Sequence, residues 1–225
     1  MTGHRPLTIA HRAGNELPLL RIAEAAGVDL VEADVWSWHG RLEVRHTKTM
    51  GPVPLLWDRW KLAPGWTHRL TIEELLEAAA PATEFMFDLK GHDPLLPERL
   101  IQAVHETAPA PRFSVCSQSW DLLDSFRDHP DVRVAHSIGS EKQLGEVWPR
   151  LTWHGHHVIS IHRKLLSLQT VRLLKERAEL VFTWPINTVE VLREVMGWGV
   201  DGVISDSIPL LRNLIAGRSD LNPGP

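Results

Sequence analysis

Short apolar segments rich in Val, Ile and Phe alternate with amphipathic segments along the chain, and this alternation limits the fold more than any other feature. Strands are predicted at residues 6–11, 29–36, 84–90, 112–117, 132–136, 157–161, 179–184 and 201–206. Helices are predicted near 16–26, 71–80, 95–107, 120–128, 140–149, 167–177, 188–197 and 208–216. Such alternation indicates a parallel sheet covered by helices. Eight units are the number that closes a (β/α)8 TIM barrel, and periodicity leaves a doubly wound open sheet as the alternative.

The composition favours one domain. A chain of 225 residues, 43% hydrophobic and 23% charged, can bury one large core, and we expect the barrel at 1–217 and a flexible tail at 218–225. A net charge of −4 argues against nucleic acid or an anionic membrane as partner. With a single cysteine, Cys116, and no apolar run long enough to span a bilayer, we expect a cytoplasmic protein without a transmembrane segment. The sequence leaves the oligomeric state unknown.

One connection is longer than the others. Residues 46–70 follow the second predicted strand and contain several Pro and Gly without clear periodicity, so we expect a short irregular segment there. The segment carries Trp57, Trp60 and Trp66. In a barrel it lies on the face at the carboxyl ends of the strands, where such enzymes place their active sites.

Two carboxylates lie two residues apart in the apolar segment VEADVWSW, residues 31–38. Glu32 and Asp34 therefore project from one face of a strand, and Asp88 holds a similar place in FMFDLK, residues 85–90. Like charges repel by roughly 4 kcal/mol at 4 Å in an intermediate dielectric, and Lys90 offsets only one of the three. A divalent cation with oxygen ligands, Mg²⁺ or Ca²⁺ with Mn²⁺ as a further candidate, removes the repulsion. The alternative is a set of ordinary salt-bridge partners on a polar rim.

Two histidines are candidates for a general acid and a general base, since imidazole titrates near pH ~6.5. His11 ends the first predicted strand, and His46 follows a short extended segment after a turn at His39–Gly40, so it folds back over the second strand. Three further polar residues end strands on the same side. Asp206 is expected to cap the last helix, while Ser117 and His162 are candidates for orienting a polar head group.

Three motifs follow one another early in the chain, AHRAGN at 10–15, EAAGVDLVEADV at 24–35 and GRLEVRHT at 40–47. They carry a resemblance to the glycerophosphodiester phosphodiesterase family, within the phosphatidylinositol-phosphodiesterase-like TIM-barrel superfamily. The resemblance continues through FMFDLK, VFTWPIN at 181–187 and GVDGVISDSIP at 199–209, and so covers nearly the whole chain. Departures from the family pattern are Ala13 for Gly, Thr47 for Asp and Asp88 for Glu.

The resemblance implies a metal-dependent phosphodiester hydrolase that releases glycerol 3-phosphate and an alcohol from a small-molecule diester. It implies these roles: His11 and His46 as the acid/base pair, Glu32, Asp34 and Asp88 as metal ligands, and Arg12, Lys90, Trp184 and Asn187 as substrate-binding residues. The sequence does not assign acid and base between the two histidines.

Three other functions are compatible with parts of the pattern. Tryptophans of the 46–70 segment, with Trp36 and Trp38, favour a lysophospholipase D or sphingomyelinase D-like enzyme with an apolar wall for an acyl chain. Lys90 as a Schiff-base nucleophile would make an aldolase-type barrel, but it leaves the carboxylates without a role. A non-catalytic phosphate-binding barrel is the third alternative.

Overall fold

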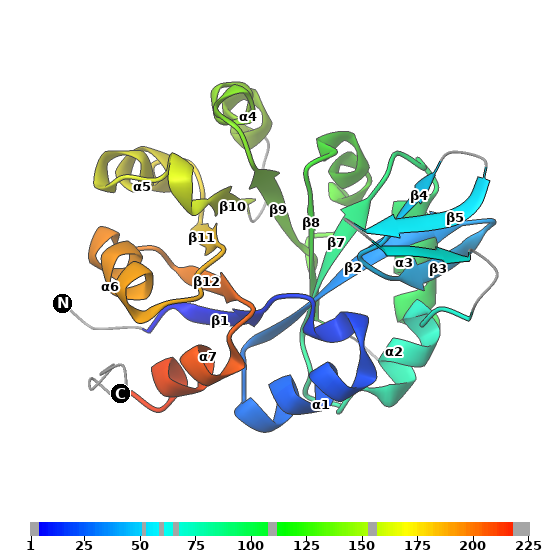
Figure 1. Ribbon diagram of the computed structural model, residues 1–225. Coiled ribbons are helices and arrows are strands. Elements are labelled where there is room, and N and C mark those ends of the chain that lie inside the picture. The colour runs from blue at the N-terminus through cyan, green and yellow to red at the C-terminus, as the bar shows by residue number, and fades with distance from the viewer. Residues whose placement is uncertain are drawn as a thin grey trace.

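The computed structural model describes residues 5–50, 53–58, 61–64, 68–107, 112–152 and 157–217. Eight parallel strands in these residues form a closed ring, since β1 pairs with both β2 and β12. In ring order they are β1 (Leu7–Ala10), β2 (Leu30–Trp38), β7 (Phe85–Lys90), β8 (Phe113–Ser117), β9 (Arg133–Ile138), β10 (His157–His162), β11 (Leu180–Trp184) and β12 (Gly202–Ser205). The predicted single-domain TIM barrel is confirmed, and all eight predicted strands are present (Figure 1).

Helices surround the barrel in Figure 1 and begin close to the predicted positions. They are α1 (Leu17–Ala26), α2 (Ile72–Ala78), α3 (Leu96–Thr107), α4 (Glu141–Glu146), α5 (Leu168–Lys175), α6 (Val189–Trp198) and α7 (Ile208–Ile215). Short 3-10 helices add η1 (Ala13–Asn15), η2 (Trp120–Phe126), η3 (Trp148–Thr152) and η4 (Arg163–Leu165). The segment predicted as a helix at 120–128 is η2, a 3-10 helix. No helix in the described part of the chain is long and apolar enough to cross a bilayer.

The strands bury different residues on their two faces, as their period of two requires. Inward-facing residues fill the barrel floor: Ile9, Leu30, Met86, Cys116, Ala135, Val158, Phe182 and Ile204. Gly202 is needed there, because a Cβ atom at this position would lie 2.4 Å from the Phe182 ring. Outward-facing residues such as Phe87 and Ile159 pack under the helices. The floor is therefore apolar and closed, and polar inward-facing residues concentrate toward the carboxyl ends of the strands.

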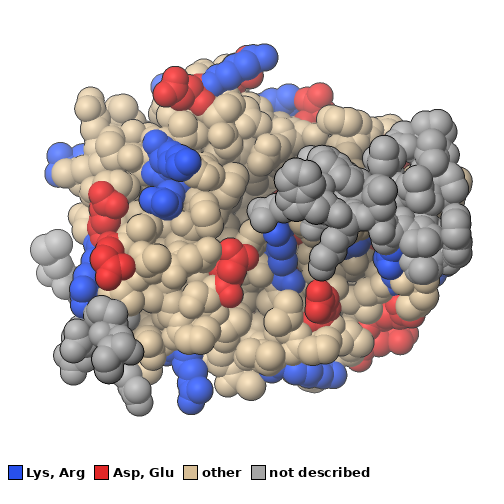
Figure 2. Space-filling model, in the orientation of Figure 1, with Lys and Arg blue, Asp and Glu red and all other residues tan. Residues whose placement is uncertain are grey.

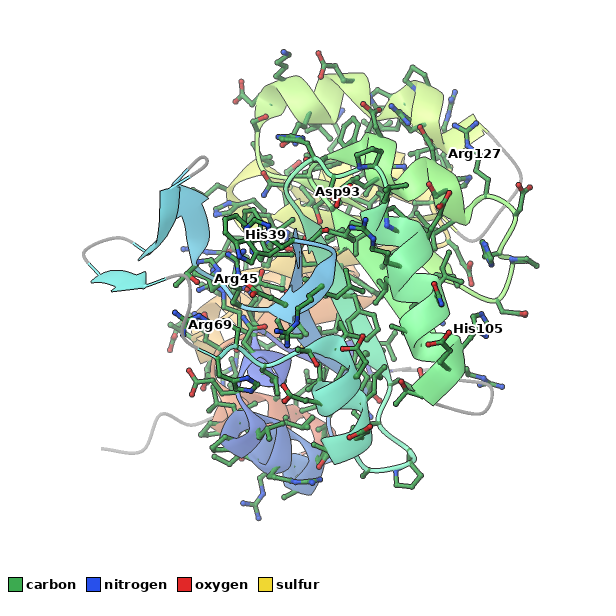
Figure 3. All side chains as sticks on the ribbon, turned by 90° about the vertical axis from the view of Figure 1, so that its right-hand side faces the viewer. His39, Arg45, Arg69, Asp93, His105 and Arg127 are labelled. Atoms are coloured by element: carbon green, nitrogen blue, oxygen red, sulfur yellow. The ribbon has the colours of Figure 1, made fainter. Side chains whose placement is uncertain are left out.

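The connection after β2 differs from the prediction of an irregular segment. The chain turns at His39 and Gly40, both with positive φ, and returns as β3 (Arg41–Val44), antiparallel to β2. Beyond it, β4 (Lys48–Met50), β5 (Val53–Asp58) and β6 (Lys61–Pro64) form a small antiparallel sheet. Figure 3 shows this sheet projecting from one end of the barrel, while His105 and Arg127 lie toward the other. Backbone pairing between β-rich stretches overrode the Pro and Gly content of this segment.

Helix α2 illustrates why elements begin where the sequence predicts. Thr71 accepts a hydrogen bond from the Glu74 backbone N–H, and the Glu74 carboxylate accepts one from the Thr71 N–H. This capping box satisfies two amide groups that the helix leaves unpaired. Thr71 also forms a bridge to Glu43 of β3, so the cap fixes the hairpin beside the barrel.

Candidate active site

Three carboxylates meet at the mouth of the barrel, at the carboxyl ends of neighbouring strands. Glu32 and Asp34 come from β2, Asp88 comes from β7, and the strand register pairs Asp34 with Asp88. One oxygen from each residue lies within 4.8 Å of the others. Glu32 and Asp34 are 3% and 1% exposed, so water screens their mutual repulsion poorly. The predicted carboxylate set is therefore brought together in space.

Lys90 is the cation nearest to this cluster. Its Nζ lies 2.9 Å from an Asp34 oxygen and also contacts Asp88. Although burial opposes the charged form, the charges of Asp88 and Asp34 raise the pKa of Lys90 above its usual value. One ammonium group does not balance three acids. Burial and the charge of Asp34 raise the pKa of Glu32, because the ionised form of Glu32 is poorly compensated at this site.

The two other acids of the cluster differ in their environments. Burial raises the pKa of Asp88, against the opposing charge of Lys90. Burial also acts on Asp34, but hydrogen bonds from His46 and Lys90 hold the pKa of Asp34 well below its usual range. Asn15 adds two further bonds, since its amide donates to Asp34 Oδ2 at 2.8 Å and accepts from the Asp34 N–H at 2.8 Å. Sequence reasoning assigned no role to Asn15, although Asn15 closes the AHRAGN motif at 10–15.

The β1–α1 loop supplies a further donor. Arg12 has a left-handed backbone with φ of 55°, uncommon for a residue with a side chain. Its backbone N–H donates to Glu32 Oε2 at 2.5 Å. Its side chain is partly exposed, and the Nε atom lies 3.7 Å from Asp34 Oδ2. The guanidinium predicted to bind phosphate thus borders the carboxylate cluster.

His11 belongs to a chain of hydrogen bonds that the sequence did not reveal. Its Nδ1 lies 2.7 Å from Asp206 Oδ1, and the Asn187 amide donates to Asp206 Oδ2 at 2.9 Å. Burial lowers the pKa of His11, but the bond to Asp206 and the charge of Glu32 outweigh burial and raise it. The bond from His11 in turn lowers the pKa of Asp206 to about 2. A carboxylate cannot donate, so in the neutral ring Nδ1 carries the proton and Nε2 is left to exchange one.

The expectation that Asp206 caps the last helix is wrong. Ser207 is the N-cap of α7, and its hydroxyl accepts from the Leu210 N–H. The Asn187 side chain has internal partners, because its amide oxygen accepts from Ser205 Oγ and from the Asp206 N–H. Both ends of the Asn187 side chain are thus engaged in holding Asp206. Its role as a substrate contact stays a prediction.

His46 reaches the site as the hairpin predicts. The Arg45 N–H donates to the Asp34 carbonyl at 3.0 Å, which continues the β2–β3 pairing, and His46 Nδ1 then lies 3.2 Å from Asp34 Oδ2. His11 and His46 therefore come from separate segments and border neighbouring acids of the cluster. Figure 2 shows acidic and basic side chains around the centre of this face of the molecule.

The tryptophans considered as pocket residues do not form one common surface. Trp184 ends β11 and packs edge-on against His162, with ring centroids 4.8 Å apart. Trp36 is half-buried under the Arg45 guanidinium, 4.9 Å from its ring centroid, and so does not form an open apolar wall. Of the segment's tryptophans, Trp60 and Trp66 and the side chain of Trp57 lie outside what the structure describes. Ser117 is buried, with its hydroxyl bonded to the Leu89 carbonyl and the Ser119 N–H.

The chemistry of the cluster suits a hard divalent cation. Glu32, Asp34 and Asp88 offer carboxylate oxygens alone, without thiolate or imidazole among the three. Such ligands are typical of Mg²⁺, Ca²⁺ and Mn²⁺ and atypical of structural Zn²⁺. Burial with one compensating Lys leaves negative charge that a cation would balance.

Known proteins resemble this chain in sequence and in fold. The profile described as "Glycerophosphoryl diester phosphodiesterase family" matches residues 181–208. A glycerophosphodiester phosphodiesterase of Caldanaerobacter subterraneus is 25% identical over 94% of this chain and 98% of that protein. Glycerophosphodiester phosphodiesterase GDPD4 of Arabidopsis thaliana is 23% identical over 64% of this chain, which spans only 46% of that relative. In fold, an Oleispira antarctica phosphodiesterase solved with its product sn-glycerol-3-phosphate matches with a TM-score of 0.74 and 18% identity, covering 94% of this chain and 97% of the other.

Proposed function

The chain belongs to the glycerophosphodiester phosphodiesterase family, and we propose that it is a metal-dependent hydrolase cleaving glycerophosphodiesters to glycerol 3-phosphate and an alcohol. One observation carries the proposal. Three carboxylates, two of them buried and one half-buried, converge at the barrel mouth, and each of two histidines is held there by its own carboxylate. Proton transfer and charge stabilisation are what cleavage of an anionic diester requires.

Glu32, Asp34 and Asp88 would hold the divalent cation. When bound, a cation of this kind stabilises the negative charge that develops on phosphoryl oxygens. Lys90 and Arg12 border the same space and supply positive charge for the non-bridging oxygens. Asn15 holds Asp34 through its Oδ2, and the Arg12 N–H holds Glu32 through its Oε2, so both carboxylates are fixed in place.

The partners of the two histidines suggest which one donates and which one accepts a proton. Asp206, outside the ligand set, can stabilise an imidazolium at His11 throughout the reaction. Asp34, the partner of His46, would have its charge neutralised by the cation. We therefore assign His11 as the acid that protonates the leaving alkoxide and His46 as the base that deprotonates the attacking hydroxyl.

The activity is tested with glycerophosphodiesters after EDTA treatment, with Mg²⁺, Ca²⁺ or Mn²⁺ restored and release of glycerol 3-phosphate measured. Activity should vanish with EDTA and return when a cation is restored. Asp88→Asn should abolish activity, whereas the control Glu77→Gln, on the exposed side of α2, should retain it. Unimpaired turnover in EDTA would contradict a metal-dependent hydrolase. A cytoplasmic location stays a prediction.

The lipid phosphodiesterase alternative depended on an apolar wall. Among the described residues, Trp36 is covered by Arg45 and Trp38 packs edge-on against His39, with ring centroids 4.5 Å apart. No described feature therefore favours an acyl chain over a small water-soluble alcohol at this site.

A further inference from the structure

The side of the barrel mouth opposite the carboxylates has a different chemistry. In the ring order β10 lies four strands from β2 in either direction, and β11 lies four strands from β7. The residues that end these strands, His162 and Trp184, therefore face the Glu32–Asp34–Asp88 cluster across the mouth. A phosphodiester whose phosphate is held by the cluster and Lys90 has its leaving alcohol directed to one side of this opening.

His162 presents a defined hydrogen-bond donor on that side. Its Nδ1 accepts from the Lys164 backbone N–H at 3.2 Å, so the proton of the neutral ring is on Nε2. Burial, Lys164 and Arg163 lower the pKa of His162, which favours that neutral form. The ring continues the inward-facing row of Val158 and Ser160 and packs against Trp184.

The loop after His162 is basic. Residues 163–167 read RKLLS and residues 185–188 read PINT, so neither loop contains an acid. The carboxylate that the second loop contacts, Asp206, is bonded to Asn187 and paired with His11. Arg163 is half-buried and Lys164 exposed, and neither takes part in an ion pair within the described residues. Figure 2 shows basic side chains where α5 lies in Figure 1, with acidic side chains beside them toward α6.

We propose that His162, Arg163 and Lys164 form the subsite for the leaving alcohol and select hydroxyl-rich or anionic alcohols over the quaternary ammonium of choline. The inference rests on the proposed function and names its substrate class. A hydroxyl can accept from His162 Nε2–H, and unpaired cations repel a trimethylammonium group. An open Trp face would favour choline through cation–π attraction, but the Trp184 and His162 rings meet edge to face, and Arg163 and Lys164 directly follow His162 in the chain.

The test compares kcat/KM for glycerophosphoglycerol and glycerophosphocholine, with saturating divalent cation and glycerol 3-phosphate release as readout. Wild type should favour glycerophosphoglycerol by about tenfold. Arg163→Glu with Lys164→Glu should lower that preference by about tenfold, and the effect should shrink at about 0.5 M salt. His162→Leu should lower kcat/KM for glycerophosphoglycerol more than for glycerophosphocholine, and His162→Gln, which keeps an N–H donor, should restore part of the loss.

The matched control is Arg172→Glu with Arg177→Glu, which makes the same change of net charge at exposed positions in the last turn of α5 and just beyond it. It should leave the substrate preference unchanged. The subsite would be overturned if wild type preferred glycerophosphocholine. It would also be overturned if the active double variant Arg163→Glu, Lys164→Glu had the same substrate preference as wild type. Either result would leave the proposed function intact. Failure to cleave either diester with any of the three cations would overturn the proposed function and the subsite together.

Discussion

His11 and His46 differ in the carboxylate that holds each ring, and this difference predicts separate effects of removing them. His11→Ala should lower kcat for an alkyl diester by about 10²-fold or more, but far less for bis(p-nitrophenyl) phosphate, whose leaving phenolate needs no proton. His46→Ala should lower kcat for both substrates similarly, because each needs the attacking group deprotonated. Steady-state kinetics of the two variants on both substrates measures this.

Asp206 provides the control for that assignment, because it contacts His11 and lies outside the ligand cluster. Asp206→Asn should show the same dependence on the leaving group as His11→Ala with a smaller loss. The reverse pattern would be a small loss of kcat on bis(p-nitrophenyl) phosphate in His46→Ala and a large loss in His11→Ala. That pattern would make His46 the acid and His11 the base.

His136 is a residue whose ionisation opposes folding. It is fully buried on the outer side of β9, and its ring nitrogens have no hydrogen-bond partner among the described residues. Burial, with His157 and Arg150 nearby, lowers the pKa of His136 to about 4. The unfolded chain therefore binds a proton at higher pH than the folded chain does, and stability present above pH ~6.5 is lost as pH falls toward 4.

We expect His136 to account for a loss of about 2 kcal/mol in the free energy of unfolding between pH 7 and pH 5. In urea unfolding at both pH values, the free energy of unfolding of His136→Leu should fall between pH 7 and pH 5 by about 2 kcal/mol less than that of wild type. His105→Gln, on the exposed side of α3, serves as the control. A pH dependence unchanged in His136→Leu would show that other groups cause it.

At the scale of elements, the position of η1 depends on a close approach to β2. A Cβ atom on Gly14 would lie 2.7 Å from the Ala33 Cβ and 3.2 Å from the Glu32 carbonyl oxygen. This approach brings Asn15 to Asp34 and the Arg12 N–H to Glu32. Gly14→Ala should cost about 1–3 kcal/mol of stability and should lower cation affinity.

A double-mutant cycle separates the contact from a general loss of stability. Gly14→Ala introduces a methyl group that would meet the Cβ of Ala33, and Ala33→Gly removes that Cβ. The free energy of unfolding lost in the double variant should therefore be smaller than the sum of the two single losses, by about 1 kcal/mol. Urea unfolding and cation titration of the four proteins measure this. Strict additivity would show that the two positions do not oppose one another.

Local patterns predicted the barrel because each strand and helix carries its own signal in sequence. The capping box at Thr71, the turn at His39–Gly40 and the pair Glu32–Asp34 are all defined within a few residues. The His11–Asp206 bond joins residues 195 positions apart, so no local pattern indicates it. The β4–β6 sheet was missed for a related reason, since pairing between its strands outweighs the Pro and Gly that suggested irregular structure.

At the scale of the whole molecule, cation binding is coupled to folding and to pH. The proposed ligands come from β2 and β7, which are formed only when the barrel is closed, so a cation would bind the folded chain selectively. At a concentration of 100 times Kd it should stabilise the fold by about 2.7 kcal/mol. Thermal unfolding with and without Mg²⁺ or Ca²⁺ should show a higher Tm with cation in wild type and little change in Asp88→Asn.

The sign of the pH dependence follows from Glu32, because burial and the charge of Asp34 raise the pKa of that carboxyl, and the cation-free protein therefore holds a proton there to a higher pH than an ordinary Glu does. Ligation requires the carboxylate, so binding should release that proton. Apparent affinity should therefore fall by up to about tenfold for each pH unit below the pKa of Glu32 and level off above it. Calorimetric titration at pH 6, 7 and 8, in buffers of different ionisation enthalpy, measures both the affinity and the proton. An affinity that is constant from pH 6 to 8 with no proton released would show that Glu32 is already ionised, and that Lys90 and the Arg12 N–H compensate the buried charges better than their positions indicate.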